Sequence, residues 1–167
     1  MNLILCGMMG AGKTSVGGAI ARLTGRRFVD TDALIVGKYG NIVDIFAQSG
    51  ECYFRELETE TVRALAKEED LVIATGGGVV LKAENLSLLR RNGKIVYLRA
   101  RLDTLVSRLQ TDAERPLLQG EDLQQRLEIL INERATAYER AADFTVDVDG
   151  KTPSEIAAEI IEKTANE

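Results

Sequence analysis

Short runs with strand character alternate along the chain with segments in which apolar residues recur at helical spacing. Five of these runs are predicted strands, at residues 3–6, 27–30, 71–74, 95–98 and 144–146. Strands with nearly continuous apolar content that are separated by helices are typical of a parallel sheet covered on both faces. We therefore expect one α/β domain with three layers, α/β/α, and about five parallel strands.

The helical patterns are bounded by glycine and proline. The last one opens with Thr152-Pro153-Ser154-Glu155, which combines a capping box with a proline in the first turn. Residues 111–121 are polar, contain Pro116 and Gly120, and are predicted to form a loop. The other helical patterns run over 16–23 up to Gly25, 33–49 with a break near Gly40, 53–66, 82–92 up to Gly93, 102–109 and 123–131.

The composition excludes several kinds of binding and catalysis but says little about the fold. The 167 residues carry a net charge of −5, which argues against nucleic-acid binding through a basic surface. The chain has no histidine, which excludes Ser-His-Asp and Cys-His catalysis and histidine zinc ligands. Cys6 and Cys52 are too few for a disulfide framework or a zinc site. No apolar run has the length of a membrane span or the features of a signal peptide, so we expect a reduced, soluble, cytoplasmic protein.

A phosphate-binding pattern lies between the first predicted strand and the first predicted helix. Gly7-Met8-Met9-Gly10-Ala11-Gly12-Lys13-Thr14 matches G-x-x-x-x-G-K-[ST]. The glycines let backbone N–H groups turn inward around phosphate oxygens, and the helix N-terminus favours negative charge. Lys13 is suited to the β- and γ-phosphates, and the Thr14 hydroxyl is suited to Mg²⁺. The pattern predicts a nucleoside triphosphate ligand and leaves kinase, ATPase, GTPase and passive binder open.

Two aspartates follow the second predicted strand, in Asp30-Thr31-Asp32. Ligands of open α/β sheets bind at the carboxyl ends of the strands, so both aspartates are expected beside the phosphate loop. One is a candidate for Mg²⁺ and the other for an acceptor hydroxyl. For either residue alone, capping of the next helix is the alternative.

Two arginines have the placement of inward-facing anion ligands. Arg55 and Glu58 lie three apart on one predicted helix and can pair, and the same face continues with apolar Val62. The planar guanidinium fork of such an arginine can donate to both oxygens of a carboxylate, and a structural ion pair is the alternative. Arg134 lies beside the apolar stripe of a later helix, where it either reaches the protein edge or faces a buried anion.

The third predicted strand ends in Gly76-Gly77-Gly78. Backbone without side chains leaves room there for a ligand, and a flexible turn is the alternative.

A further arginine, Arg115, lies in the polar loop within Arg115-Pro116-Leu117-Leu118. A loop arginine that closes over the γ-phosphate would stabilise the charge of the transition state and exclude water. Without that context, a loop arginine is more often simply solvated.

Together these residues resemble the shikimate kinase family of small P-loop kinases. The phosphate loop is generic, whereas the ordered set of other motifs is far more specific: Asp30-Thr31-Asp32, Phe54-Arg55-x-x-Glu58, Gly76-Gly77-Gly78, Arg115-Pro116-Leu117-Leu118 and Glu133-Arg134. The resemblance covers nearly the whole chain. It implies a nucleoside-monophosphate-kinase type of fold over 1–167, with sheet order 2-3-1-4-5, a substrate-binding region near 32–60 and a lid near 111–122.

The resemblance also implies the reaction: ATP-dependent phosphorylation of the 3-hydroxyl of shikimate, which gives shikimate 3-phosphate and ADP in aromatic amino-acid biosynthesis. The implied catalytic residues are Lys13, Asp32 and Arg115, with Asp32 on the acceptor hydroxyl and Arg115 on the lid. One Mg²⁺ is implied per subunit, on Thr14 and, through water, on Asp30. The implied shikimate contacts are Asp32, Arg55, Gly76, Gly77, Gly78 and Arg134. The implied ATP contacts are Gly10, Ala11, Gly12, Lys13, Thr14, Ser15, Arg108, Arg115 and Pro153, with Arg108 and Pro153 flanking the adenine.

A monomer without a nucleic-acid or membrane partner is expected. Another kinase of the same fold, such as a gluconate kinase, would also act on a carboxylated polyol, but the triple glycine and Phe54-Arg55-x-x-Glu58 argue against it. A nucleotide kinase would need a second base pocket, of which the sequence gives no sign. A catalytically silent ATP-binding module is the alternative of a different class, and the presence of Asp32 and Arg115 argues against it.

Overall fold

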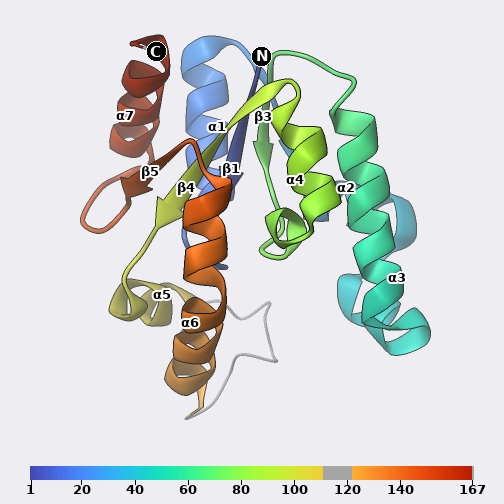
Figure 1. Cartoon of the computed structure of the whole chain (residues 1–167). Coiled ribbons are helices and arrows are strands. Elements are labelled where there is room, and N and C mark those ends of the chain that lie inside the picture. Colours follow the sequence, from blue (N-terminus) through green and yellow to red (C-terminus); the bar gives the residue numbers. More distant parts are fainter. Residues whose placement is uncertain (111–121, 167) are drawn as a thin grey trace.

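A five-stranded parallel sheet forms the centre of the computed structural model, which describes residues 1–110 and 122–166 (Figure 1). The strands are β1 (Asn2–Cys6), β2 (Arg27–Asp30), β3 (Leu71–Ala74), β4 (Gly93–Arg99) and β5 (Phe144–Asp147). Their order is β2-β3-β1-β4-β5 and every pairing is parallel, which confirms the predicted order 2-3-1-4-5. β1 is therefore central, and the phosphate loop leaves its carboxyl end.

Helices cover both faces of this sheet. The helices are α1 (Lys13–Thr24), α2 (Thr31–Tyr39), α3 (Ile42–Leu65), α4 (Ala83–Arg90), α5 (Leu102–Gln110), α6 (Leu123–Ala141) and α7 (Pro153–Ala165), with a 3-10 turn η1 (Val79–Leu81). In Figure 1, α1 and α7 lie together on one side of the strands, and α4 and α6 lie on the other. The structure has the three layers that the alternating pattern predicts.

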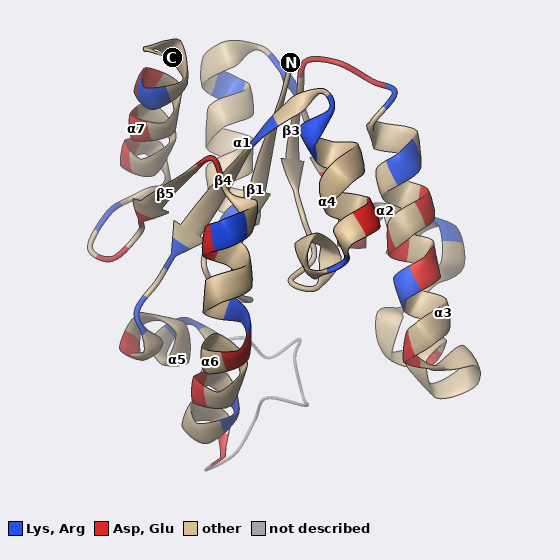
Figure 2. Ribbon diagram, viewed as in Figure 1, with Lys and Arg blue, Asp and Glu red and all other residues tan. Residues whose placement is uncertain are grey.

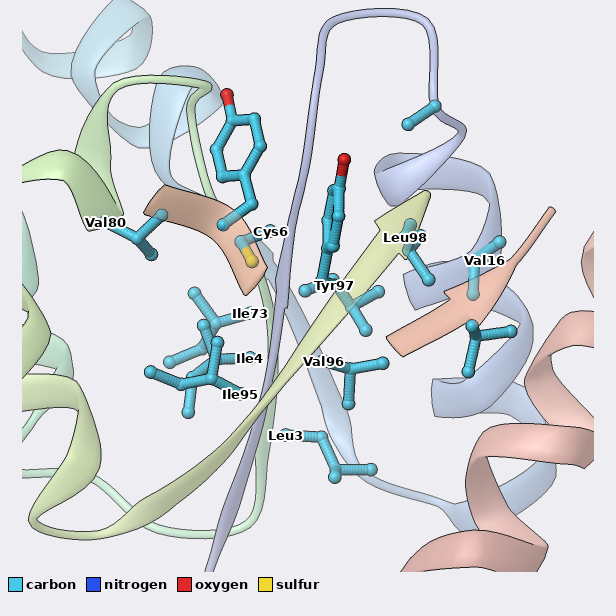
Figure 3. Packing of buried hydrophobic residues seen from close by; sticks show 14 of the residues in the cluster. Leu3, Ile4, Cys6, Val16, Ile73, Val80, Ile95, Val96, Tyr97 and Leu98 are labelled. Atoms are coloured by element: carbon cyan, nitrogen blue, oxygen red, sulfur yellow. The ribbon is translucent and has the colours of Figure 1, made fainter. Parts of the chain in front are cut away.

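The register of the central strands explains why both faces of the sheet are apolar. Ile4 of β1 pairs with Ile73 of β3 on one side and with Ile95 of β4 on the other. Figure 3 shows these three isoleucines gathered on one face, with Leu3 and Val96 on the opposite face. Full burial of an aliphatic side chain of this size contributes about 1.5–3 kcal/mol. β1 and β3 carry no charged residue, whereas the helices, the loops and the other three strands do (Figure 2).

Several helices differ from their predicted bounds, most of all α6, which was predicted over 123–131 and runs on to Ala141. α2 begins at Thr31, because the Asp30 side chain accepts hydrogen bonds from the first free backbone N–H groups and so caps the helix there. The predicted helical patterns before 49 and over 53–66 meet within α3, where the backbone of Gly50 is non-helical, with φ 83° and ψ 172°. A positive φ is a conformation that glycine adopts without strain, so Gly50 interrupts the helix and separates its two stretches.

The prediction that Gly93 stops a helix is wrong. α4 ends at Arg90, and Gly93 is the first residue of β4. A Cβ at Gly93 would lie 2.1 Å from Cδ1 of Ile4, so the close pairing of β4 with β1 requires a glycine there. The predicted loop at 111–121 lies outside the described residues. Within 1–110 and 122–166, no helix is both long and apolar enough to cross a membrane.

Candidate functional site

A cavity of about 630 Å³ lies at the carboxyl ends of the central strands. Its charged lining residues are Lys13, Asp30, Asp32, Arg55, Glu58, Arg108, Arg134 and Lys151. Every predicted site residue that the structure describes lines this one cavity, from Gly10 to Ser15 of the phosphate loop to Pro153 of α7. Arg115, predicted on the lid, lies outside the described residues. The structure therefore brings together groups that are dispersed over most of the sequence.

The phosphate loop is shaped by its backbone. Gly10 and Gly12 have φ angles of 81° and 91°, in the left-handed region that turns the chain before α1 begins at Lys13. The Lys13 ammonium reaches back across the loop and donates to the carbonyl oxygens of Gly7 and Met8, each at 2.8 Å. A cationic group and the N-terminus of α1 therefore face the same space, which suits a phosphate group.

Asp30 caps α2, which was one alternative for its position, and it also contacts the phosphate loop. One carboxylate oxygen caps α2, accepting from the backbone N–H groups of Asp32 at 2.9 Å and Ala33 at 3.1 Å. The other oxygen accepts from the Thr14 hydroxyl at 2.8 Å, beside the phosphate loop. Magnesium takes oxygen ligands and usually binds through few protein groups together with phosphates and water. The hydroxyl and carboxylate oxygens of this pair fit such an ion.

The predicted pairing of Arg55 with Glu58 is confirmed. Nη1 of Arg55 donates to Oε2 of Glu58 at 2.8 Å, and Nη2 donates to Glu51 at 3.3 Å. The Glu58 side chain is 2% exposed, whereas Arg55 is 31% exposed and lines the cavity. Burial raises the pKa of the Glu58 carboxyl, and Arg55 opposes that rise. A buried acid thus orients a guanidinium that faces the open space.

The segment Gly76-Gly77-Gly78 makes room for three charged side chains of the protein itself. A Cβ on the first glycine would lie 2.6 Å from Oδ1 of Asp32, and one on the third would lie 2.2 Å from Nη1 of Arg55. On the second glycine, a Cβ would lie 3.3 Å from Nη1 of Arg134. The sequence predicted bare backbone for a ligand. The close approach of these side chains is a second reason for glycine, which the sequence pattern did not reveal.

Arg108 and Pro153 enter the cavity from two later elements. Nη1 of Arg108 donates to the carbonyl oxygen of Gly10 at 3.0 Å, which ties α5 to the phosphate loop. Pro153 opens α7 within the predicted capping box, directly after Thr152, and the side chains of Thr152 and Glu155 each accept from the other's backbone N–H. Both residues therefore border the cavity on fixed helix ends.

Two residues that hold the site together were missed in the sequence. Thr31 is fully buried, and its hydroxyl accepts from the backbone N–H of Gly76 at 2.9 Å, which joins the ends of β2 and β3. Tyr138 is also fully buried, and its hydroxyl donates to the carbonyl oxygen of Gly77 at 2.7 Å. The spacing of Tyr138, four residues after Arg134 on one helix, is the sequence signal that could have placed it here.

Comparison with known proteins gives a consistent family. The model of the shikimate kinase family matches residues 9–165. The shikimate kinase of Geobacter sulfurreducens is 45% identical over 160 residues, which are 95% of this chain and 88% of that protein. The shikimate kinase of Chromobacterium violaceum is 42% identical over 163 residues, which are 97% of this chain and 89% of that protein.

Solved structures agree with the sequence comparison. The shikimate kinase from Acinetobacter baumannii in complex with shikimate has a TM-score of 0.93 at 37% identity, over 99% of this chain and 93% of that chain. A gluconokinase from Sinorhizobium meliloti has a TM-score of 0.63 at 20% identity, over 99% of this chain and 91% of that chain. The second likeness shows a shared fold and nothing beyond it.

Proposed function

The chain belongs to the shikimate kinase family, and from this we propose that its cavity is where ATP phosphorylates the 3-hydroxyl of shikimate. The protein is an ATP-dependent kinase of aromatic biosynthesis, and its products are shikimate 3-phosphate and ADP. One observation carries the assignment of the site. A phosphate loop and the side chains of Asp32, Arg55 and Arg134 line one cavity, as a nucleotide and a small carboxylated polyol require.

The donor side binds the phosphates of ATP. We assign residues Gly10 to Ser15 to the β- and γ-phosphates, through backbone N–H groups at the start of α1. Lys13 neutralises charge on the transferring group, because its ammonium already lies over the loop. Phosphoryl transfer depends chiefly on positioning and electrostatic stabilisation, which these groups supply.

The metal site is assigned to Thr14 and Asp30. One Mg²⁺ fits their paired hydroxyl and carboxylate oxygens, with Asp30 acting through water. A bound Mg²⁺ neutralises phosphate charge and orients the phosphate chain. Asp30 stays oriented toward this position, because the N-terminus of α2 holds its other oxygen.

The acceptor side binds shikimate. Arg55 and Arg134 hold the carboxylate, since a guanidinium donates two parallel hydrogen bonds to such a group. Asp32 lies near Glu58 beside Gly76, and it lines the same cavity as Arg55. It accepts the hydrogen bond of the 3-hydroxyl and takes its proton as the new O–P bond forms and the bond to ADP breaks.

The substrate-binding region near 32–60 has a small core of its own. Ile35, Ile45, Phe54 and Leu57 form a hydrophobic cluster separate from the main core. This packing supports a region that carries Arg55 as a unit. The lid near 111–122 with Arg115 at the γ-phosphate and the adenine position between Arg108 and Pro153 remain predictions of the resemblance. The cytoplasmic location and the monomeric state remain predictions from the sequence.

The test is ADP release from MgATP with shikimate, with gluconate, with a nucleoside monophosphate or without an acceptor. We expect rapid release with shikimate alone. Release with gluconate instead would keep the phosphate loop and overturn the acceptor residues. ATP binding without release in any of the four reactions would identify a silent ATP-binding module.

A further inference from the structure

Tyr138 lies on α6 one turn after Arg134, and it is fully buried. Residues four apart on a helix share a face, so the tyrosine and the arginine approach the glycine segment from the same side. The Tyr138 ring packs against the ring of Tyr97 on β4, with centroids 5.2 Å apart. Packing against the sheet therefore fixes where the Tyr138 hydroxyl lies.

That hydroxyl joins the glycine segment to Arg134. It donates to the carbonyl oxygen of Gly77 at 2.7 Å. Nη1 of Arg134 and the Tyr138 hydroxyl lie 3.3 and 3.5 Å from the place where a Cβ of Gly77 would stand. Burial raises the pKa of Tyr138, whereas the charge and hydrogen bond of Arg134 oppose that rise. A hydroxyl has one proton and two lone pairs, so this one can donate to Gly77 while it accepts from Arg134.

We propose that Tyr138 is a positioning residue. Its hydroxyl fixes the Arg134 guanidinium against the Gly77 turn, where Arg134 binds the shikimate carboxylate. The inference rests on the proposed role of Arg134 in binding shikimate. An arginine side chain has substantial rotamer freedom, and ordering it before the substrate arrives removes that cost from binding. The only contact of the hydroxyl with the phosphate loop that the described residues show is a weak one, 4.0 Å from Sδ of Met8. Tyr138 therefore acts on shikimate binding much more than on ATP binding.

The first experiment compares Tyr138→Phe with Tyr97→Phe. Loss of the Tyr138 hydroxyl is expected to raise KM for shikimate about three- to tenfold, the effect of one hydrogen bond, with kcat and KM for MgATP within about twofold. Tyr97 offers a matched control, because its ring belongs to the same pair and the described residues show no hydrogen bond from it to Arg134 or Gly77. An unchanged KM for shikimate in Tyr138→Phe overturns the inference.

A double-mutant cycle separates positioning from general support of the fold. In an Arg134→Ala background, Tyr138→Phe is expected to leave kcat/KM for shikimate unchanged, because the group through which it acts is gone. A purely structural role would lower kcat/KM by the same factor in both backgrounds, and that result overturns the inference. Phenylalanine keeps the ring of Tyr138 and its packing against Tyr97, so the variant should fold, and its circular dichroism spectrum should match that of the wild type.

Failure of the proposed function can be distinguished from failure of the role of Tyr138. If the unmodified enzyme shows no shikimate-dependent ADP release, the substrate assignment is wrong, whatever the variants do. If the enzyme turns over shikimate and the Tyr138→Phe variant has a normal KM, only the role of Tyr138 is wrong.

Discussion

The phosphate loop and the acceptor side of the same cavity are built by different means. The phosphate loop is one continuous stretch at the end of β1, and its shape comes from left-handed backbone at Gly10 and Gly12. The acceptor side is made of side chains from α2, α3 and α6, among them Asp32, Arg55 and Arg134, around the glycine segment that follows β3. One half is therefore local in sequence, and the other forms only when the sheet and helices have packed.

This difference determines which ligand each substitution affects. Backbone N–H groups do not depend on side-chain identity, whereas Arg55 is oriented by Glu58 and approaches the glycine segment too closely for a side chain there. Changes on the acceptor side should therefore alter shikimate binding or turnover and leave nucleotide binding nearly intact. The following substitutions test that separation.

The largest effect is expected from Asp32→Asn. Loss of the carboxylate that takes the acceptor proton should lower kcat by about 10²- to 10⁴-fold, the usual contribution of a positioned acid or base. KM for MgATP should stay within about twofold, because Asp32 belongs to the acceptor side. Steady-state kinetics with saturating shikimate measure both constants. Asp44→Asn, which alters an exposed carboxylate on α3, is the control, and normal turnover in Asp32→Asn would remove the carboxylate from the reaction.

A smaller effect is expected from Arg55→Lys. Lysine keeps the charge but loses the planar fork, so KM for shikimate should rise about 10- to 100-fold, which corresponds to a charged hydrogen bond of about 1.5–3 kcal/mol. Isothermal titration with an ATP analogue should give unchanged nucleotide affinity. Arg63→Lys on the same helix is the control, because Arg63 pairs with Glu84 on the surface. Equal weakening of both ligands would show that the two halves of the cavity are not separable.

The sequence predicted the local half of the molecule well. The phosphate loop, the capping box at Thr152 and the Arg55–Glu58 pair all depend on neighbours in sequence, whereas the strand order was implied by the family resemblance. Every predicted site residue within the described part lines one cavity, because parallel strands end at one edge of the sheet.

What could not be predicted depends on packing between distant elements. The reason for each glycine of 76–78 is a side chain from another element, which only the folded chain brings there. The hydrogen bond between Thr31 and Gly76 also joins two distant segments. Gly93 follows a helical pattern in the sequence, but in the structure it lies where β4 approaches β1 closely. The sequence around a glycine does not indicate which side chain packs against it in the folded chain.

The glycine segment permits a substitution that displaces a side chain without removing it. Gly78 has φ −93° and ψ −10°, which alanine adopts freely, but a Cβ there would lie 2.2 Å from Nη1 of Arg55. Gly78→Ala should therefore fold, move the guanidinium and raise KM for shikimate by about tenfold, roughly the loss of one good hydrogen bond. Gly37→Ala is the matched control, since nothing lies within 4 Å of its Cβ position. A normal KM in Gly78→Ala would mean that Arg55 tolerates a displaced position.

The smallest expected effect is on stability, in Glu58→Gln. Burial raises the pKa of Glu58 above its ordinary value of 4.5, so the folded state holds the proton more tightly than the unfolded state. That contribution to stability is complete below the unfolded pKa and is lost as pH rises through the folded pKa. Glutamine resembles the protonated form at every pH, so the variant should melt above the wild type at pH 7, with the difference shrinking as the pH falls toward the unfolded pKa. Thermal unfolding measures the difference in melting temperature. Glu56→Gln, which changes an exposed neighbour on α3, is the control, and a difference that widens on acidification contradicts the prediction.

KM for shikimate should rise in Glu58→Gln, because the neutral amide orients Arg55 less firmly than the carboxylate does. Stability and acceptor binding would therefore change in opposite directions.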